Sequence, residues 1–363
     1  MHHPFPTLAS RLPRWPRPPH TPLRTPPPTG APPAPGTASL VPAPKAKLTP
    51  TLTPGLALAL VAMFSAAPMA PVHALALQAH PVAATCAPPT PPVAAQLPLP
   101  AAAAQRIPDS QVVAGRHDVA WTWLASPTRR YPHTALGNSV HAGSVQAVVR
   151  LAGGPWQSVS YTLPLHRVFE DRVPRLHDLD GDGRDELLLI EADAFKGAAL
   201  VVLGVRASAN GTPELTELAR GPHAGSSFRW LNPVGVADFD GDGQLDVASV
   251  TTPHIGGVLT LHNVRPPHLL PFATHMDVSN HRMGALEQRL AVVVAQPGQR
   301  PAIVVPDMSL QALQALRWQA SGQWEELAAP LALPGRIERL LPLPGGACAE
   351  LADGGFWRIR LSH

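Results

Sequence analysis

Two short acidic stretches carry the residues with the clearest chemistry. Residues 178–186 read Asp-Leu-Asp-Gly-Asp-Gly-Arg-Asp-Glu, and residues 238–246 read Asp-Phe-Asp-Gly-Asp-Gly-Gln-Leu-Asp. Each places Asp at positions 1, 3 and 5, Gly at position 6 and an acid at position 9. Three carboxylates on alternate residues of a tight turn repel one another unless a cation lies among them, and oxygen ligands suit calcium. We therefore predict two calcium-binding turns, the first acidic loop (178–186) and the second acidic loop (238–246).

Two other interpretations of these loops exist. An EF-hand needs a bidentate Glu at position 12 and a helix on each side. Position 12 is Leu189 in the first loop and Ser249 in the second, and strand-like runs follow, so an EF-hand is excluded. A metal-free surface turn is the other interpretation, and two copies with identical ligand spacing argue against it. We expect the calcium to be structural.

The elements that position these loops are short apolar strands in a repeating order. The loops start 238 − 178 = 60 residues apart, and each is followed by strand, turn and strand. Further copies are expected at 292–305 and 336–361, with an incomplete one at 115–172. The predicted strands are residues 119–124, 145–151, 159–163, 186–191, 200–205, 215–219, 246–251, 258–263, 269–273, 290–295, 302–305, 313–318, 324–328, 336–341 and 357–361. Residues 309–318 are the one stretch with an alternative interpretation, a short helix.

This period is typical of β-propeller blades. The predicted fold is all-β, a small β-propeller of about five four-stranded antiparallel blades over residues 105–363. The acidic loops, strand order and spacing resemble the FG-GAP/VCBS repeats of integrin-like propellers, in which such a loop binds calcium between adjacent strands. The resemblance implies ligands from Asp178, Asp180, Asp182, the carbonyl of Arg184 and Glu186, and from Asp238, Asp240, Asp242, the carbonyl of Gln244 and Asp246. Glu186 departs from the usual Asp.

The amino-terminal third differs sharply in composition. Residues 1–100 contain no Asp or Glu and 26 of the 46 prolines. We expect residues 1–54 to be a disordered leader, with translation starting later than Met1, and residues 55–76 to be a signal peptide with an apolar core and an Ala-Leu-Ala cleavage site. An organelle transit peptide is the alternative. Residues 77–104 are expected to be an Ala/Pro-rich linker. The protein is then exported, periplasmic or secreted, without a stable membrane span after cleavage.

The net charge of the chain restricts its possible partners, and its cysteine content restricts the cellular compartment. Residues 101–363 contain 22 Lys and Arg against 25 Asp and Glu, a net charge of −3. A basic surface for nucleic acid is therefore not expected. The two cysteines, Cys86 and Cys348, fit an exported protein with at most one disulfide, and their spacing leaves open whether they pair.

No catalytic motif is present, and the 17 histidines are scattered. His133, His254 and His281 stand in similar contexts, and they either cap turns or meet at a central channel as ligand contacts. We predict a non-catalytic binding module with a protein or carbohydrate ligand. One alternative is an enzyme acting on polysaccharide or ester through channel carboxylates or histidines, and another is a structural envelope or adhesion component.

Overall fold

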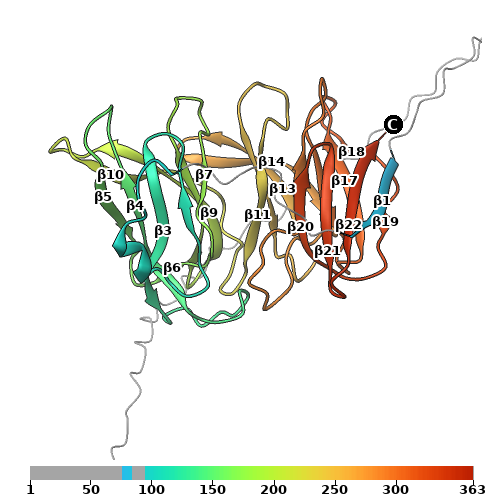
Figure 1. Cartoon of the computed structure of the whole chain (residues 1–363), viewed down its shortest axis with the longest axis horizontal. Coiled ribbons are helices and arrows are strands. Elements are labelled where there is room, and N and C mark those ends of the chain that lie inside the picture. Colours follow the sequence, from blue (N-terminus) through green and yellow to red (C-terminus); the bar gives the residue numbers. More distant parts are fainter. Residues whose placement is uncertain (1–75, 84–94, 363) are drawn as a thin grey trace, which may run out of the picture. The chain divides into compact units, whose positions relative to one another are not determined.

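The computed structural model describes residues 76–83 and 95–362 (Figure 1). Within these residues the regular secondary structure is β-strand, paired antiparallel except for one bridge, with one short 3₁₀ helix, η1 (Ala101–Gln105). The all-β prediction is confirmed. The described strands group into five units, blades 1 to 5, and isolated pairings such as Ala142↔Phe169 join blades 1, 2 and 3.

The blades follow the order of the chain, except that the first strand belongs to the last blade. Blade 1 consists of β2 (Val112–Ala114), β3 (Val119–Thr128), β4 (His141–Val149) and β5 (Gln157–Thr162). Blade 2 consists of β6 (Arg167–Phe169), β7 (Arg175–His177), β8 (Glu186–Asp193), β9 (Gly197–Ala207) and β10 (Pro213–Arg220). Blade 3 consists of β11 (Leu231–Ala237), β12 (Asp246–Thr251), β13 (Val258–Arg265) and β14 (His268–Met276).

Blade 4 consists of β15 (Val292–Val294), β16 (Ala302–Pro306), β17 (Ala312–Trp318), β18 (Trp324–Glu326) and β19 (Leu331–Ala332). Blade 5 consists of β20 (Ile337–Leu343), β21 (Gly346–Leu351), β22 (Phe356–Ser362) and β1 (Ala76–Val82). Since β17 pairs with β16 over its length, the helical alternative for residues 309–318 is wrong. The short inner strands β7 and β11, which lead into the acidic loops, were not among the predicted strands.

Strand β1 corrects the expected linker at residues 77–104. Residues 76–82 pair antiparallel with β22, from Ala76↔Ser362 to Val82↔Phe356. Leu77 is buried in the core between blades 4 and 5. The linker was predicted from the Ala/Pro-rich composition of this segment, but proline is tolerated at a sheet edge, where β1 and its Pro81 lie. The amino-terminal end of the described chain therefore completes the carboxy-terminal blade.

Apolar clusters lie between successive blades and hold them together. The apolar residues come from the faces of neighbouring sheets, as expected for strands buried on both sides. The clusters contain Leu124 and Leu187 between blades 1 and 2, Leu188 and Trp230 between blades 2 and 3, Leu259 and Ile303 between blades 3 and 4, and Val304 and Leu340 between blades 4 and 5. The other face of blade 1 packs on η1 and Leu97 through Trp123.

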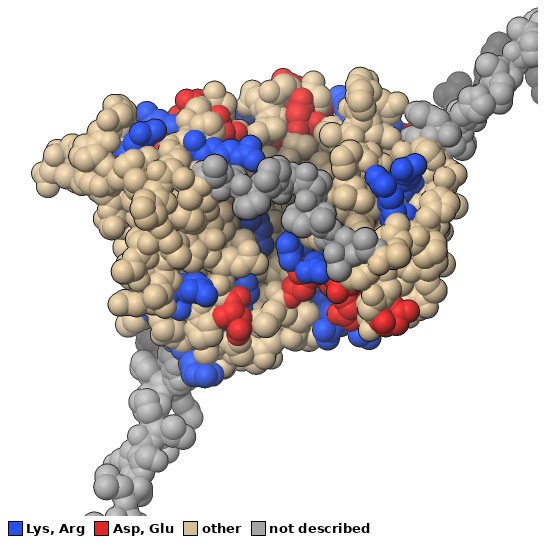
Figure 2. All heavy atoms as spheres, in the orientation of Figure 1, with Lys and Arg blue, Asp and Glu red and all other residues tan. Residues whose placement is uncertain are grey.

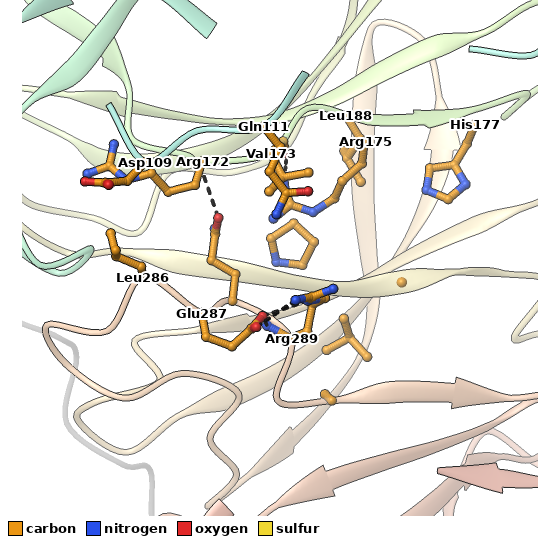
Figure 3. A pocket seen from close by; sticks show the side chains of 15 residues that line it. Asp109, Gln111, Arg172, Val173, Arg175, His177, Leu188, Leu286, Glu287 and Arg289 are labelled. Carbon is orange, nitrogen blue, oxygen red and sulfur yellow. Dashed lines mark hydrogen bonds and ion pairs between the residues drawn. The ribbon is translucent and has the colours of Figure 1, made fainter. Parts of the chain in front are cut away.

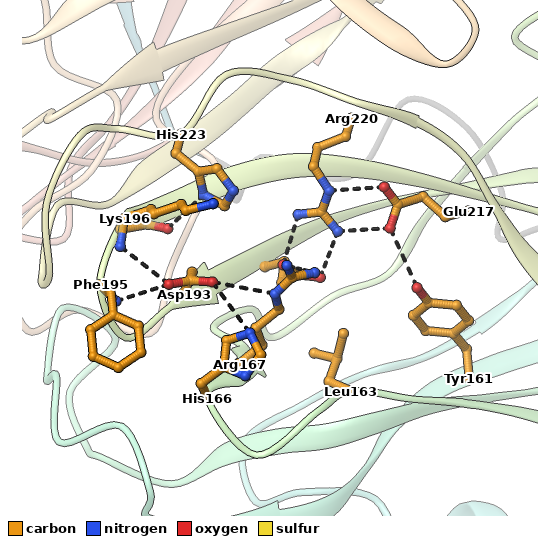
Figure 4. A network of polar contacts seen from close by, with 12 residues as sticks. Tyr161, Leu163, His166, Arg167, Asp193, Phe195, Lys196, Glu217, Arg220 and His223 are labelled. Carbon is orange, nitrogen blue, oxygen red and sulfur yellow. Dashed lines mark hydrogen bonds and ion pairs between the residues drawn. The ribbon is translucent and has the colours of Figure 1, made fainter. Parts of the chain in front are cut away.

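A network of ion pairs within blade 2 is linked to blade 1 by a hydrogen bond from Tyr161 (Figure 4). Glu191 is fully buried and accepts two hydrogen bonds from Arg220, at 2.7 and 2.9 Å. Arg220 also binds Glu217, and Tyr161 on β5 of blade 1 donates to Glu217 at 3.3 Å. Because both oxygens of Glu191 are paired with Arg220, this network has a structural role.

Two sequence expectations fall partly outside the described residues. The leader and signal-peptide region up to residue 75, and Cys86, lie outside them. Cys348 on β21 is buried and disulfide-bonded. In the part of the chain that the structure describes, no helix has the length and apolar character needed to cross a bilayer.

Candidate metal centres and ligand pocket

The first acidic loop connects β7 to β8 and is folded by its own side chains. Gly183 donates its N–H to Asp178 Oδ2 at 3.0 Å, and Arg184 donates its N–H to Asp182 Oδ1 at 2.9 Å. Gly183 has φ of 80°, a left-handed conformation that glycine adopts without strain. The turn therefore folds the acidic residues back toward one another.

This turn brings together the carboxylates at positions 1, 3 and 9 of the first loop. One carboxylate oxygen each from Asp178, Asp180 and Glu186 lies within 4.8 Å of the others. Glu186 is 2% exposed, and its Oε2 accepts the Leu179 N–H at 2.8 Å. Glu186 Oε1 and Asp178 Oδ1 are buried and have no hydrogen-bond partner among the described residues. Burial, reinforced by the neighbouring aspartates, raises the pKa of Glu186 to about 8.

The second acidic loop, between β11 and β12, repeats this geometry. Asp238, Asp240 and Asp246 bring carboxylate oxygens within 4.8 Å of one another. Phe239 donates its N–H to Asp246 at 3.0 Å, as Leu179 does to Glu186. Burial raises the pKa of Asp246 to about 6. The two loops are thus copies in structure as well as in sequence.

The residues of both loops fit a hard divalent cation. The donors gathered in both loops are all carboxylate oxygens, the ligands that calcium prefers. In the first loop, the two buried oxygens without partners also need a positive charge beside them. The structure brings together positions 1, 3 and 9 but not position 5. Asp182 and Asp242 at position 5 each accept a backbone N–H from within the loop. Ligation by position 5 and by the carbonyls of Arg184 and Gln244 stays a prediction.

The three histidines singled out in the sequence lie in two side-chain pairs, one with Glu170 and one between two of the histidines. His133 Nδ1 lies 2.7 Å from Glu170 Oε1, and His254 Nε2 lies 2.8 Å from His281 Nδ1. His254 is in the β12–β13 connection, whereas the second acidic loop is in the β11–β12 connection. Successive connections of an antiparallel blade lie at opposite ends, so His254 is remote from the acidic loop.

Aromatic rings surround these pairs. Trp230 stacks parallel to His254 at 6.0 Å between ring centroids, and its Nε1 donates to the Glu170 carbonyl at 3.1 Å. Phe228 is 49% exposed and lies 5.5 Å from the His133 ring. Its φ of 63° is uncommon for a bulky residue. Sequence reasoning missed Glu170, because nothing local marks an isolated acid as the partner of a distant histidine.

A pocket of about 500 Å³ lies beside the inner strands β7 and β11. Its walls come from residues before and within β7, from β11, and from the connection between blades 3 and 4. Three arginines, Arg172, Arg175 and Arg289, line it together with two acids, Asp109 and Glu287. Figure 3 shows Arg175 and Arg289 reaching the pocket from opposite walls. Sequence reasoning had not identified these arginines, since Arg289 lies more than 100 residues from Arg172 and Arg175 in the chain.

The arginines retain donors that the protein does not use. Arg175 binds Asp171 and the Val173 carbonyl through its NH1 nitrogen alone. Arg289 binds Glu287 through Nε and NH2. Among the described residues, the remaining guanidinium nitrogens of these two arginines have no hydrogen-bond partner. The pocket can therefore donate to an anionic group, whereas the surface in Figure 2 shows cationic and acidic side chains interspersed.

Comparison with known proteins agrees with the acidic-loop geometry. Residues 178–249 match the model of the FG-GAP-like repeat family. The match spans both acidic loops and confirms the resemblance found in the sequence. No curated protein matches the chain.

Two solved structures are also similar. BamB from Moraxella catarrhalis is 16% identical, with a TM-score of 0.35, over 70% of this chain and 68% of that one. The rhamnogalacturonan lyase YesW is 16% identical, with a TM-score of 0.32, over 58% of this chain and half (50%) of that one. We infer no function from either. The chain contains an FG-GAP-like repeat within a β-propeller.

Proposed function

We propose that this FG-GAP-repeat β-propeller is an exported calcium-binding protein that acts by binding a ligand. The observation that carries the calcium assignment is the pair of buried oxygens without partners, Asp178 Oδ1 and Glu186 Oε1, beside Asp180. Calcium supplies the missing positive charge and holds each loop in its turn. Isothermal titration of the chelator-treated protein tests this: we expect calcium binding that Asp180→Ala together with Asp240→Ala removes. Absence of binding by the unsubstituted protein would overturn the assignment.

The ligand site of this module is the arginine-lined pocket. The donors left free on Arg175 and Arg289 suit a carboxylate, and we propose a carbohydrate ligand that carries one. A glycan array that contains both acidic and neutral sugars tests this. We expect binding of acidic glycans that is lost in Arg175→Gln and Arg289→Gln and retained in Arg360→Gln, an exposed position on β22. Equal binding by all four proteins would place the ligand elsewhere.

Export follows from the signal peptide expected at residues 55–76. Fractionation of the producing cells and amino-terminal sequencing of the protein test it. We expect the protein outside the cytoplasm, beginning near Leu77. A cytoplasmic protein that retains residues 55–76 would contradict it.

A second candidate function, an enzyme acting on polysaccharide or ester, is favoured by one observation. His133 is paired with a fully buried glutamate and is itself only 12% exposed. A carboxylate that orients a histidine is the usual arrangement for a general base. Hydrolysis of ester and glycoside substrates that is lost in His133→Gln would support this candidate, and full activity of that variant would exclude His133 as the base.

A further inference from the structure

The two acidic loops have the same ligand pattern but different neighbours on the third strand of their blades. In blade 3, Asn263 of β13 lies directly across from Asp246. In blade 2, Leu187 of β8 pairs with Leu203 of β9. The two strands are antiparallel, so continuing this register by one residue places Gly204 across from Glu186. The corresponding tripeptides are Asn263-Val-Arg265 and Gly204-Val-Arg206.

In the second loop these neighbours occupy the carboxylates. Asn263 Nδ2 donates to Asp246 Oδ1 at 2.8 Å and to Asp240 Oδ2 at 3.0 Å. Arg265 NH2 donates to Asp242 Oδ2 at 2.8 Å, and Arg265 also binds the Gln244 side chain. Protein donors thus already take up part of the negative charge that a cation would neutralise.

In the first loop the same places give no such donor. A Cβ on Gly204 would lie 2.5 Å from Leu218 Cδ1 and 3.4 Å from Arg206 NH1, so Gly204 leaves no room for a side chain that could donate to Glu186 as Asn263 does to Asp246. Arg206 binds its own-strand carbonyl on Val205 at 2.9 Å, much as Arg265 binds that of Val264 at 3.2 Å. Among the described contacts Arg206 has none with the loop, and Glu186 Oε1 keeps no partner.

The arginines beside the two loops also differ in how they contact the loop residues. The guanidinium of Arg300 packs on Gly241 in the second loop, where a Cβ would lie 2.8 Å from its Nε. The second loop therefore has two arginines from outside the loop beside it, Arg265 at the end of β13 and Arg300 in the β15–β16 connection. The first loop has Arg184 from within the loop, 3.8 Å from Asp182. Arg116 and Arg150 of blade 1 line a hollow with Asp182. Of the arginines outside the two loops, however, only Arg265 forms a described ion pair with a loop carboxylate, so the first loop keeps more unpaired negative charge to attract an added ion.

We propose that the loops bind divalent cations in order, the first acidic loop before the second, and that Arg265 is the internal cation that competes for the second. This inference rests on the calcium binding proposed above. Calcium entering the second loop displaces Arg265 from Asp242 and the Asn263 amide from Asp240 and Asp246. Calcium entering the first loop meets oxygens that have no partner to lose. The second site is therefore the weaker one.

Calorimetric titration of the chelator-treated chain with calcium tests the order. We expect two separable steps. Asp180→Ala should remove the tighter step and Asp240→Ala the weaker one. Arg265→Gln should tighten the weaker step about two- to fivefold, the range expected for losing one exposed ion pair. The matched control is Arg206→Gln, at the corresponding position of blade 2, which should leave both steps unchanged.

The outcomes separate this inference from the calcium assignment. Loss of the tighter step in Asp240→Ala, or two steps of equal affinity, would overturn the order. An Arg265→Gln variant whose weaker step is unchanged or weakened would overturn the role of Arg265. In each of these cases calcium binding itself stands. If the unsubstituted chain shows neither heat nor a thermal shift with calcium, the calcium assignment fails and this inference fails with it.

Discussion

His133 Nδ1 lies 2.7 Å from Glu170 Oε1, and Glu170 is completely excluded from solvent. Burial raises the pKa of Glu170, and the bond to His133 opposes that rise. Neither carboxylate oxygen of Glu170 has another hydrogen-bond partner among the described residues, so a negative charge on Glu170 would depend on His133 for its stabilisation. This pair joins the β3–β4 connection to the segment after β6.

We expect His133→Ala to destabilise the fold by about 3–5 kcal/mol, because it leaves a buried carboxylate without its partner. Glu170→Gln should cost less, since it removes the charge that requires pairing. In chemical denaturation the double variant should be more stable than the sum of the two single effects predicts. A cost below about 1 kcal/mol for His133→Ala would show that Glu170 is neutral and independent of His133.

Calcium should stabilise the folded chain. If only the folded state holds the ion, calcium at about 100 times its Kd adds about 2.7 kcal/mol per independent site. We expect thermal unfolding to shift upward with calcium and to lose the shift in the variant with both Asp180→Ala and Asp240→Ala. Glu214→Ala, an exposed acid on β10, is the control and should keep the shift. Equal shifts in all three proteins would point to calcium bound elsewhere.

Acid should destabilise the fold through its buried histidines. Burial lowers the pKa of His141 and His254 to about 4 and that of His281 to about 3. In the unfolded chain these histidines titrate near pH 6.5. Below that pH the unfolded state binds more protons, so their contribution to stability is complete above about pH 6.5 and is lost as the pH falls toward about 4.

The measurement is the free energy of unfolding from pH 7.5 to 4, compared between the unsubstituted chain and His254→Gln. Glutamine keeps a donor near the position of Nε2 but does not titrate. The variant should therefore show a shallower loss of stability below about pH 6.5. Parallel curves would mean that His254 is not held neutral in the fold.

Strand β1 should contribute to the stability of blade 5. Leu77 is 9% exposed and packs in the core between blades 4 and 5. We expect Leu77→Ala to cost about 2–3 kcal/mol in the free energy of unfolding. Gln78→Ala, on the exposed face of the same strand, should cost less than about 0.5 kcal/mol. Equal effects of the two substitutions would indicate that β1 is not packed in solution.

The sequence alone predicted the features that are local and repeated. Ligand spacing, glycine position and strand length lie within one contiguous stretch, so the acidic loops, the blade-like repeat and most strands could be read directly. Strand β7 was not predicted because its three residues, Arg-Leu-His, are too few to show a periodic pattern. Strand β1 was not predicted because its sequence gives no sign of a partner strand almost 300 residues away.

Tertiary structure decided everything that depends on which distant segments meet. Glu170 gains its role from His133, and the pocket gains its arginines from blade 2 and from the connection between blades 3 and 4. Asn263 and Gly204 distinguish two loops whose own sequences look alike. The physical reason is that burial and charge act across space: the residue opposite a carboxylate is set by strand register and blade packing, and neither appears in the loop's own residues.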